Sequence, residues 1–186
     1  MDNGTVSLDG SAFELVRLLT DSGQNIVFAE SCTAGLLSAT MGRVPGVSGV
    51  MAGSAVVYQV MTKHTWLGVS EKLLRDPGPV SRTVSERMAE GVLAETPQAT
   101  IAASVTGHLG PAAPPHLDGI AWSTVAIRKK DGIRLHSTQL QLTPATTAMT
   151  DGQMDGLAIR HARQQSAVKQ VLGFCVRITS AWDRFY

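Results

Sequence analysis

The stretch Asn25-Ile26-Val27-Phe28-Ala29-Glu30-Ser31-Cys32-Thr33-Ala34-Gly35-Leu36-Leu37 decides the fold of this chain. Its first four residues form a short apolar run with β-branched side chains, which is typical of a strand. After Gly35, apolar and small residues continue at helical spacing, and small polar residues lie between the two runs. The pattern predicts a strand that ends in a tight turn and leads into a helix.

The predicted turn carries two hydroxyl groups, on Ser31 and Thr33, at the start of a helix. The first N–H groups of a helix lack intrahelical acceptors, and the helix dipole adds partial positive charge there. A phosphate or a developing oxyanion is stabilised in such a position. The structural alternative is that one hydroxyl only caps the helix, as Ser and Thr commonly do.

The composition is that of a globular protein with 186 residues, 44% hydrophobic and 17% charged, and a net charge of +1. This charge and an aromatic content of 5% argue against a nucleic-acid partner. Cys32 and Cys175 are too far apart in sequence for a zinc framework, and we expect neither a metal nor a cofactor. The first residues lack a leader pattern and no apolar run reaches membrane-spanning length, so we expect no membrane partner and a cytoplasmic location.

Two further apolar runs, at 50–58 and 99–105, predict buried strands. The first leads into the segment Tyr58 to Lys63, and the second into the loop Thr106 to Pro111. In open α/β sheets, ligands bind outside the carboxyl ends of the strands. We therefore expect both segments to meet the turn around Ser31 at one end of a sheet.

The second half of the chain predicts a hairpin followed by a long helix. Two strands, at 119–128 and 133–142, flank Asp131-Gly132, a favoured hairpin turn, and a helix begins near Met154. The fold class is α/β: a three-layer α/β/α sandwich with a mixed, mainly parallel sheet and a late antiparallel hairpin. We expect one domain over 1–186, with 1–7 flexible and 154–186 forming the helix and an aromatic tail. We expect that tail to pack on the body or on a second subunit, and we expect a homo-oligomer, a dimer or higher.

The segments around Ser31, Tyr58, Lys63 and Thr106 match the pattern of a known family. The chain resembles the C-terminal domain of the competence/damage-inducible CinA family, whose active members are nicotinamide-nucleotide amidases. The likeness is good from about Leu8 to Arg128 and looser beyond. The matching segments are Ala29-Glu30-Ser31-Cys32-Thr33-Ala34-Gly35-Leu36-Leu37, Val44-Pro45-Gly46, Tyr58, Lys63, Leu67-Gly68-Val69, Val80-Ser81, Met88-Ala89-Glu90-Gly91, Val105-Thr106-Gly107 and Gly110-Pro111.

The resemblance implies a reaction in pyridine nucleotide salvage. Nicotinamide mononucleotide would be hydrolysed to nicotinic acid mononucleotide and ammonia without a metal or cofactor. Ser31 matches the family's nucleophile and Lys63 its base, with Tyr58 alongside. The residues expected to bind the nucleotide substrate are Glu30, Cys32, Thr33, Ala34, Gly35, Thr106, Gly107, His108, Gly110 and Arg163; Arg160 is the other candidate on the last helix.

The chain departs from the family pattern at two places. The family has a Gly-rich loop with a lysine where this chain has 111–118, which is rich in proline and lacks lysine, and an Asn-Glu pair where it has Val60 and Met61. These departures favour two alternatives: a Ser/Lys amidohydrolase with another substrate, or a regulatory relative that binds a nucleotide without turnover. A nucleophilic Cys32 at the helix start is a further rival. Taken alone, Lys63 would be a solvated surface lysine.

Overall fold

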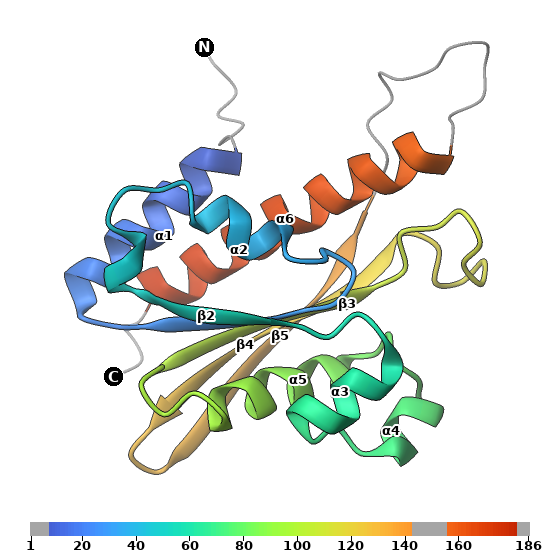
Figure 1. Ribbon diagram of the computed structural model, residues 1–186, viewed down its shortest axis with the longest axis horizontal. Coiled ribbons are helices and arrows are strands. Elements are labelled where there is room, and N and C mark those ends of the chain that lie inside the picture. The colour runs from blue at the N-terminus through green and yellow to red at the C-terminus, as the bar shows by residue number, and fades with distance from the viewer. Residues whose placement is uncertain (1–7, 143–155, 182–186) are drawn as a thin grey trace.

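A computed structural model describes residues 8–142 and 156–181 of the chain (Figure 1). The segments that we expected to be flexible (1–7) and to form the aromatic tail (182–186) lie outside these ranges. The elements follow in the order α1 (Leu8–Ser22), β1 (Ile26–Glu30), α2 (Leu36–Met41), the 3₁₀ turn Val47–Gly49, β2 (Met51–Val56), α3 (Val60–Leu67), α4 (Glu71–Arg75), α5 (Arg82–Ala94), β3 (Ile101–Gly107), β4 (Ile120–Lys129), β5 (Gly132–Gln141) and α6 (Gly156–Ser180).

The five strands form one mixed sheet in the order β2-β1-β3-β4-β5. Strand β1 pairs in parallel with both β2 and β3, whereas β4 is antiparallel to β3 and to β5. Helices α1, α2 and α6 cover one face of the sheet and α3, α4 and α5 the other (Figure 1). The predicted three-layer α/β/α class with a late antiparallel hairpin is confirmed.

Alternation along β1 explains how one strand supports both layers. Ile26 and Phe28 belong to the core beneath α1, α2 and α6, and Val27 and Ala29 to the core beneath α3, α4 and α5. Successive side chains of a strand point to opposite faces, so a central strand must be apolar throughout. The continuous run at 26–29 is therefore buried on both sides, as the pattern predicted.

The register of the three parallel strands fixes where the site can form. At the carboxyl end of β1, Glu30 pairs with Val56 of β2 and with Val105 of β3. The residues that follow these strands therefore begin side by side at one edge of the sheet. This confirms that the segments after Glu30, Val56 and Val105 converge.

The hairpin turn lies one residue earlier than we predicted. Lys129 pairs with Gly132, so the two-residue loop is Lys130-Asp131, and Gly132 is already the first residue of β5. Gly132 has a φ of +137°, a conformation that favours glycine. The pattern therefore identified the hairpin correctly but placed glycine inside the loop rather than next to it.

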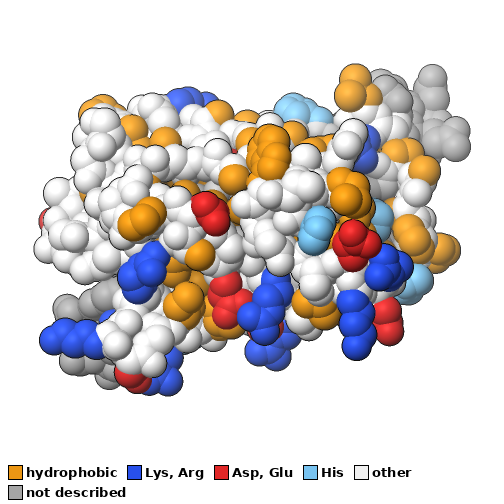
Figure 2. Space-filling view, turned by 60° about the horizontal axis from the view of Figure 1, so that its bottom comes forward, with side chains coloured by type: hydrophobic (Ala, Val, Ile, Leu, Met, Phe, Trp, Pro, Cys, Tyr) orange, Lys and Arg blue, Asp and Glu red, His pale blue; other side chains and the backbone are white. Residues whose placement is uncertain are grey.

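Charged side chains of both signs are mixed on the face that carries α3, α4 and α5 (Figure 2). Hydrophobic side chains are exposed among them, including Val60, Met61 and Trp66 of α3. Among the described residues, no helix is both long and apolar enough to cross a membrane.

Two helical glycines make a matched pair for a test of stability. In Gly91→Ala, the new Cβ would lie 2.2 Å from the carbonyl oxygen of Leu67, so α5 must move away from α3. We expect a loss of about 3 kcal/mol in the free energy of unfolding. In Gly173→Ala, the Cβ would meet only the end of Arg177, at 4.0 Å, and a gain of up to about 1 kcal/mol follows from helix propensity. Urea denaturation measures both changes, and equal effects would contradict the tight α3–α5 contact.

Candidate functional site

The turn after β1 places Ser31 at the carboxyl edge of the sheet. Its backbone N–H donates to the carbonyl oxygen of Val105, at 3.0 Å, which continues the pairing with β3 by one residue. The Ser31 carbonyl then accepts from the N–H of Ala34, at 3.0 Å, and closes a tight turn. Ser31 is 7% exposed, and its side chain lines a pocket at this edge.

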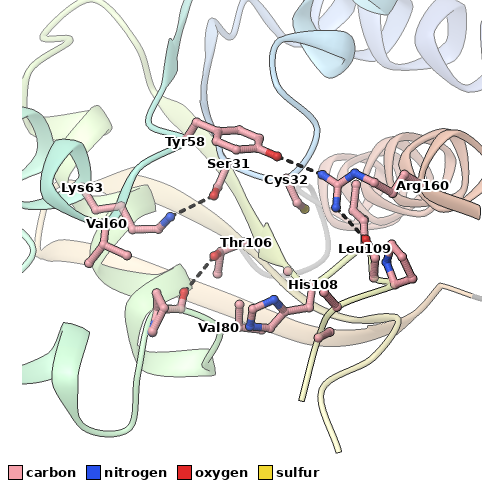
Figure 3. A pocket seen from close by; sticks show the side chains of 16 residues that line it. Ser31, Cys32, Tyr58, Val60, Lys63, Val80, Thr106, His108, Leu109 and Arg160 are labelled. Atoms are coloured by element: carbon pink, nitrogen blue, oxygen red, sulfur yellow. Dashed lines mark hydrogen bonds between the residues drawn. The ribbon is translucent and has the colours of Figure 1, made fainter. Parts of the chain in front are cut away.

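Lys63 reaches Ser31 from the first half of α3 (Figure 3). Its Nζ donates to Ser31 Oγ at 2.8 Å and to the carbonyl oxygen of Val57 at 3.3 Å. Lys63 is 2% exposed, and none of the described carboxylates forms an ion pair with it. Burial lowers the pKa of Lys63 from 10.5 to about 8. A neutral amine is therefore accessible near neutral pH, within hydrogen-bond distance of a hydroxyl.

The pair opens into a cavity of about 420 Å³, a size at which proteins bind small molecules. The predicted site residues that line it are Ser31, Cys32, Tyr58, Lys63, Thr106, Gly107, His108 and Gly110. Lys63 and Arg160 contribute positive charge, and none of the described lining residues is Asp or Glu. The pocket therefore favours a ligand with negative charge.

Tyr58 lies on the rim of this pocket, but its hydroxyl turns away from the Ser31–Lys63 pair (Figure 3). Arg160 Nη2 donates to Tyr58 Oη at 2.9 Å, and Nη1 donates to the carbonyl oxygen of Gly110 at 2.7 Å. Tyr58 is 52% exposed. The contacts thus make Tyr58 part of the pocket wall next to Arg160.

His108 points into the pocket on the side of Thr106 and Val80 (Figure 3). Burial lowers the pKa of His108, although nearby Asp118 opposes the shift. A lowered pKa favours the neutral imidazole at pH 7. Thr106 supplies no free hydroxyl proton in this arrangement, because its Oγ1 donates to the carbonyl oxygen of Pro79 at 2.8 Å.

The helix start that we expected to face a ligand is occupied by Glu30. Its carboxylate accepts from the N–H groups of Gly35, Leu37 and Ser38 and from the Thr33 hydroxyl. Neither Ser31 nor Thr33 caps α2, because Gly35 is its N-cap residue and makes no side-chain cap. Glu30, Thr33 and Gly35, which we expected to bind the substrate, therefore do not line the pocket. Ala34 lines a neighbouring cavity of about 510 Å³.

We expected Arg163 to bind the substrate and kept Arg160 as the other candidate on the last helix, and the structure places Arg160 at the pocket. Arg163 is 8% exposed and does not line the pocket; it forms two hydrogen bonds with the Asp118 carboxylate, at 2.7 and 2.8 Å. It also donates to the carbonyl oxygens of Leu109 and Leu142. Arg160, one turn earlier on α6, lines the pocket. The arginine available to a ligand is therefore Arg160.

Cys32 does not have the reactive environment that its place in the sequence suggested. Burial raises the pKa of the Cys32 thiol to about 12, although the Lys63 charge opposes the shift. A thiol is nucleophilic as thiolate, so this shift disfavours Cys32 as the attacking group. In the described part of the chain, no group of three or more His, Cys, Asp or Glu side chains could hold a metal ion.

The protein is a three-layer α/β/α protein with a buried Ser–Lys pair at the carboxyl edge of its parallel strands. The family model of the CinA C-terminal domain matches residues 9–164. The chain belongs to this family.

Relatives and solved structures agree with this assignment. A CinA-like protein of Mycobacterium sp. (strain JLS) is 37% identical over 126 residues, 68% of this chain and 30% of that protein. One of Myxococcus xanthus (strain DK1622) is 42% identical over 106 residues, 56% of this chain and 25% of that protein. The matches therefore span less than a third of these relatives.

The same fold occurs in solved structures. A competence-damaged protein (CinA) superfamily protein from Enterobacter cloacae has a TM-score of 0.81 at 20% identity, covering 96% of each chain. The competence/damage-inducible protein CihA from Agrobacterium tumefaciens has a TM-score of 0.77 at 24% identity, covering 92% of this chain and 94% of that chain. At these identities the likeness establishes the fold.

Proposed function

We propose that this chain is an amidohydrolase that acts on the carboxamide of a nucleotide. The observation that carries the proposal is the 2.8 Å contact between Lys63 Nζ and Ser31 Oγ at the wall of a pocket. A carboxamide is a poor electrophile, so the attacking hydroxyl needs a base within hydrogen-bond reach. Lys63 meets this requirement because burial keeps a neutral amine accessible.

The reaction proceeds in two halves. Ser31 Oγ attacks the amide carbon while Lys63 Nζ takes the hydroxyl proton. The tetrahedral intermediate breaks its C–N bond, and Lys63 returns the proton to the leaving nitrogen, which departs as ammonia. Water then attacks the ester on Ser31, with Lys63 again as the base, and releases the carboxylic acid and the free serine.

The proposed substrate is nicotinamide mononucleotide, and the product is nicotinic acid mononucleotide. The positive charge of Arg160 suits a phosphate, and Val80 and Leu109 offer apolar surface for the pyridinium ring. The family assignment supports this choice of substrate. A cytoplasmic location and a homo-oligomer remain part of the proposal.

A binding protein without turnover is the second candidate. The loop that differs from the family pattern lines the pocket with Pro111, Ala112 and Ala113, and proline has no N–H to offer to a phosphate. This wall could retain nucleotide binding while losing catalytic alignment. A rise in melting temperature with the nucleotide, but without turnover, would support this candidate.

The test is ammonia release from nicotinamide mononucleotide by the purified chain, with the Ser31→Ala variant as the blank. We expect ammonia and nicotinic acid mononucleotide in equal amounts. No release above the blank would remove this substrate. If a fluorophosphonate probe still labelled Ser31 in that case, the chain would remain a proposed hydrolase, but one that acts on a different amide.

A further inference from the structure

The most heavily bonded carboxylate near the pocket belongs to Glu30, and its side chain is completely buried at the end of β1. The donors come from the turn after β1, from the first turn of α2 and from the neighbouring strand β2. The five contacts are Oε2 with Thr33 Oγ1 (2.8 Å), Gly35 N (3.0 Å) and Leu37 N (3.0 Å), and Oε1 with Ser38 N (2.9 Å) and Ser54 Oγ (3.0 Å).

The turn that this carboxylate spans has an unfavourable backbone conformation. Ala34 has a φ of +52°, and it is the only non-glycine residue with positive φ in the described ranges. The left-handed region is costly for a residue with a Cβ, so the surroundings must hold Ala34 there. Charge-assisted hydrogen bonds to Glu30 on both sides of Ala34 supply that restraint.

We propose that Glu30 is the positioning residue for the Ser31 hydroxyl. The carboxylate holds the strained turn 31–35 closed, and the closed turn keeps Ser31 Oγ 2.8 Å from Lys63 Nζ. Glu30 does not line the pocket, so it acts through the turn and not on a ligand. The inference rests on the proposed nucleophilic role of Ser31, but not on the identity of the substrate.

A carboxylate suits this position better than an amide, because all five of its hydrogen-bond partners donate to it. In Glu30→Gln, one oxygen becomes an NH₂ group, which loses the bonds from the backbone N–H donors that it faces, whereas a facing hydroxyl can turn to accept from it. We expect labelling of Ser31 by a small fluorophosphonate probe to slow about 100-fold, since a displacement of about 1 Å has such effects. Glu14→Gln makes the same change on the exposed face of α1 and is expected to label at the wild-type rate.

A second substitution separates positioning from stability. Ala34→Gly removes the cost of the left-handed conformation, so the turn needs less restraint. In the Glu30→Gln background we expect it to restore about tenfold of the labelling rate, and in the wild-type background to change it little. The rates are measured at a temperature at which circular dichroism shows each variant to be folded. A merely structural role would restore the melting temperature without restoring the labelling rate.

Each outcome decides the proposal. A folded Glu30→Gln variant that labels as fast as the wild type overturns it. If Glu30→Gln does not fold, Thr33→Val is the alternative, because it removes one donor and keeps the carboxylate. An unchanged labelling rate in Thr33→Val would overturn the positioning role of Glu30. A wild type that labels but releases no ammonia from nicotinamide mononucleotide would refute the proposed substrate and leave the role of Glu30 standing. A wild type that does not label refutes both.

Discussion

Ser31→Ala is expected to lower kcat for ammonia release by about 10⁴-fold or more, because no other group replaces a missing nucleophile in a covalent mechanism. The fold should persist, since the one side-chain bond of Ser31 within the described residues is the one with Lys63, which keeps its contact with the Val57 carbonyl. Substrate binding should persist as well, with Kd changed by less than about threefold, because the loss falls on the chemical step. An ammonia-release assay measures kcat, and isothermal titration calorimetry measures Kd.

Cys32→Ala is the matched control on the same turn. Cys32 is 5% exposed and its thiol stays protonated at neutral pH, so its removal is expected to leave kcat within about threefold. The variant should lose roughly 1 kcal/mol of stability through lost packing. The opposite pattern, with an inactive Cys32→Ala and an active Ser31→Ala, would make the thiol the nucleophile.

Lys63→Met is expected to reduce kcat by about 10³- to 10⁴-fold, the range that general base catalysis supplies. Met is unbranched like Lys and one atom shorter, so it fills most of the buried space without a basic nitrogen. For the wild type, kcat/KM, which reports the free enzyme, should rise about tenfold per pH unit below pH 8 and level off above it, because only the neutral amine can act as base. A pH-independent rate, or full activity in Lys63→Met, would remove Lys63 from the mechanism.

The same substitution should stabilise the protein. The pKa of Lys63 is about 8 in the folded state and 10.5 when exposed, so between these values the unfolded state binds more protons. Stability therefore increases with pH across this window, and the burial penalty is fully present below pH 8. Lys63→Met removes that penalty, and we expect a gain of about 2–4 kcal/mol at pH 7, measured by urea denaturation. A loss of stability at pH 7 would contradict the lowered pKa.

The sequence predicted the strands and their convergence because both follow from local physics. An apolar run such as 26–29 is recognisable wherever a central strand is buried on both faces, and parallel strands share their carboxyl edge. The pairing of Ser31 with Lys63 is not local, since the two lie 32 residues apart, and only the resemblance to a family suggested it.

The errors also have physical causes. Strand alternation predicts the face of the sheet on which a side chain lies. It does not predict that the Glu30 carboxylate accepts hydrogen bonds from the turn that follows it, because those bonds depend on where α2 begins. The sequence did not separate Arg160 from Arg163, because residues three apart on a helix differ by only about 60° around its axis. A sequence pattern does not fix the rotation of α6 that closely.

Arg160 and Arg163 of α6 hold the β3–β4 connection mainly by its backbone. Arg160 donates to the carbonyl of Gly110, and Arg163 to that of Leu109, while Asp118 provides the one side-chain partner. Main-chain oxygens are present whatever side chains the connection carries. Substitutions between Pro111 and Leu117 can therefore accumulate without detaching this wall, so that evolution can change the chemical lining of the pocket while the hydrolytic pair on the opposite wall keeps its alignment.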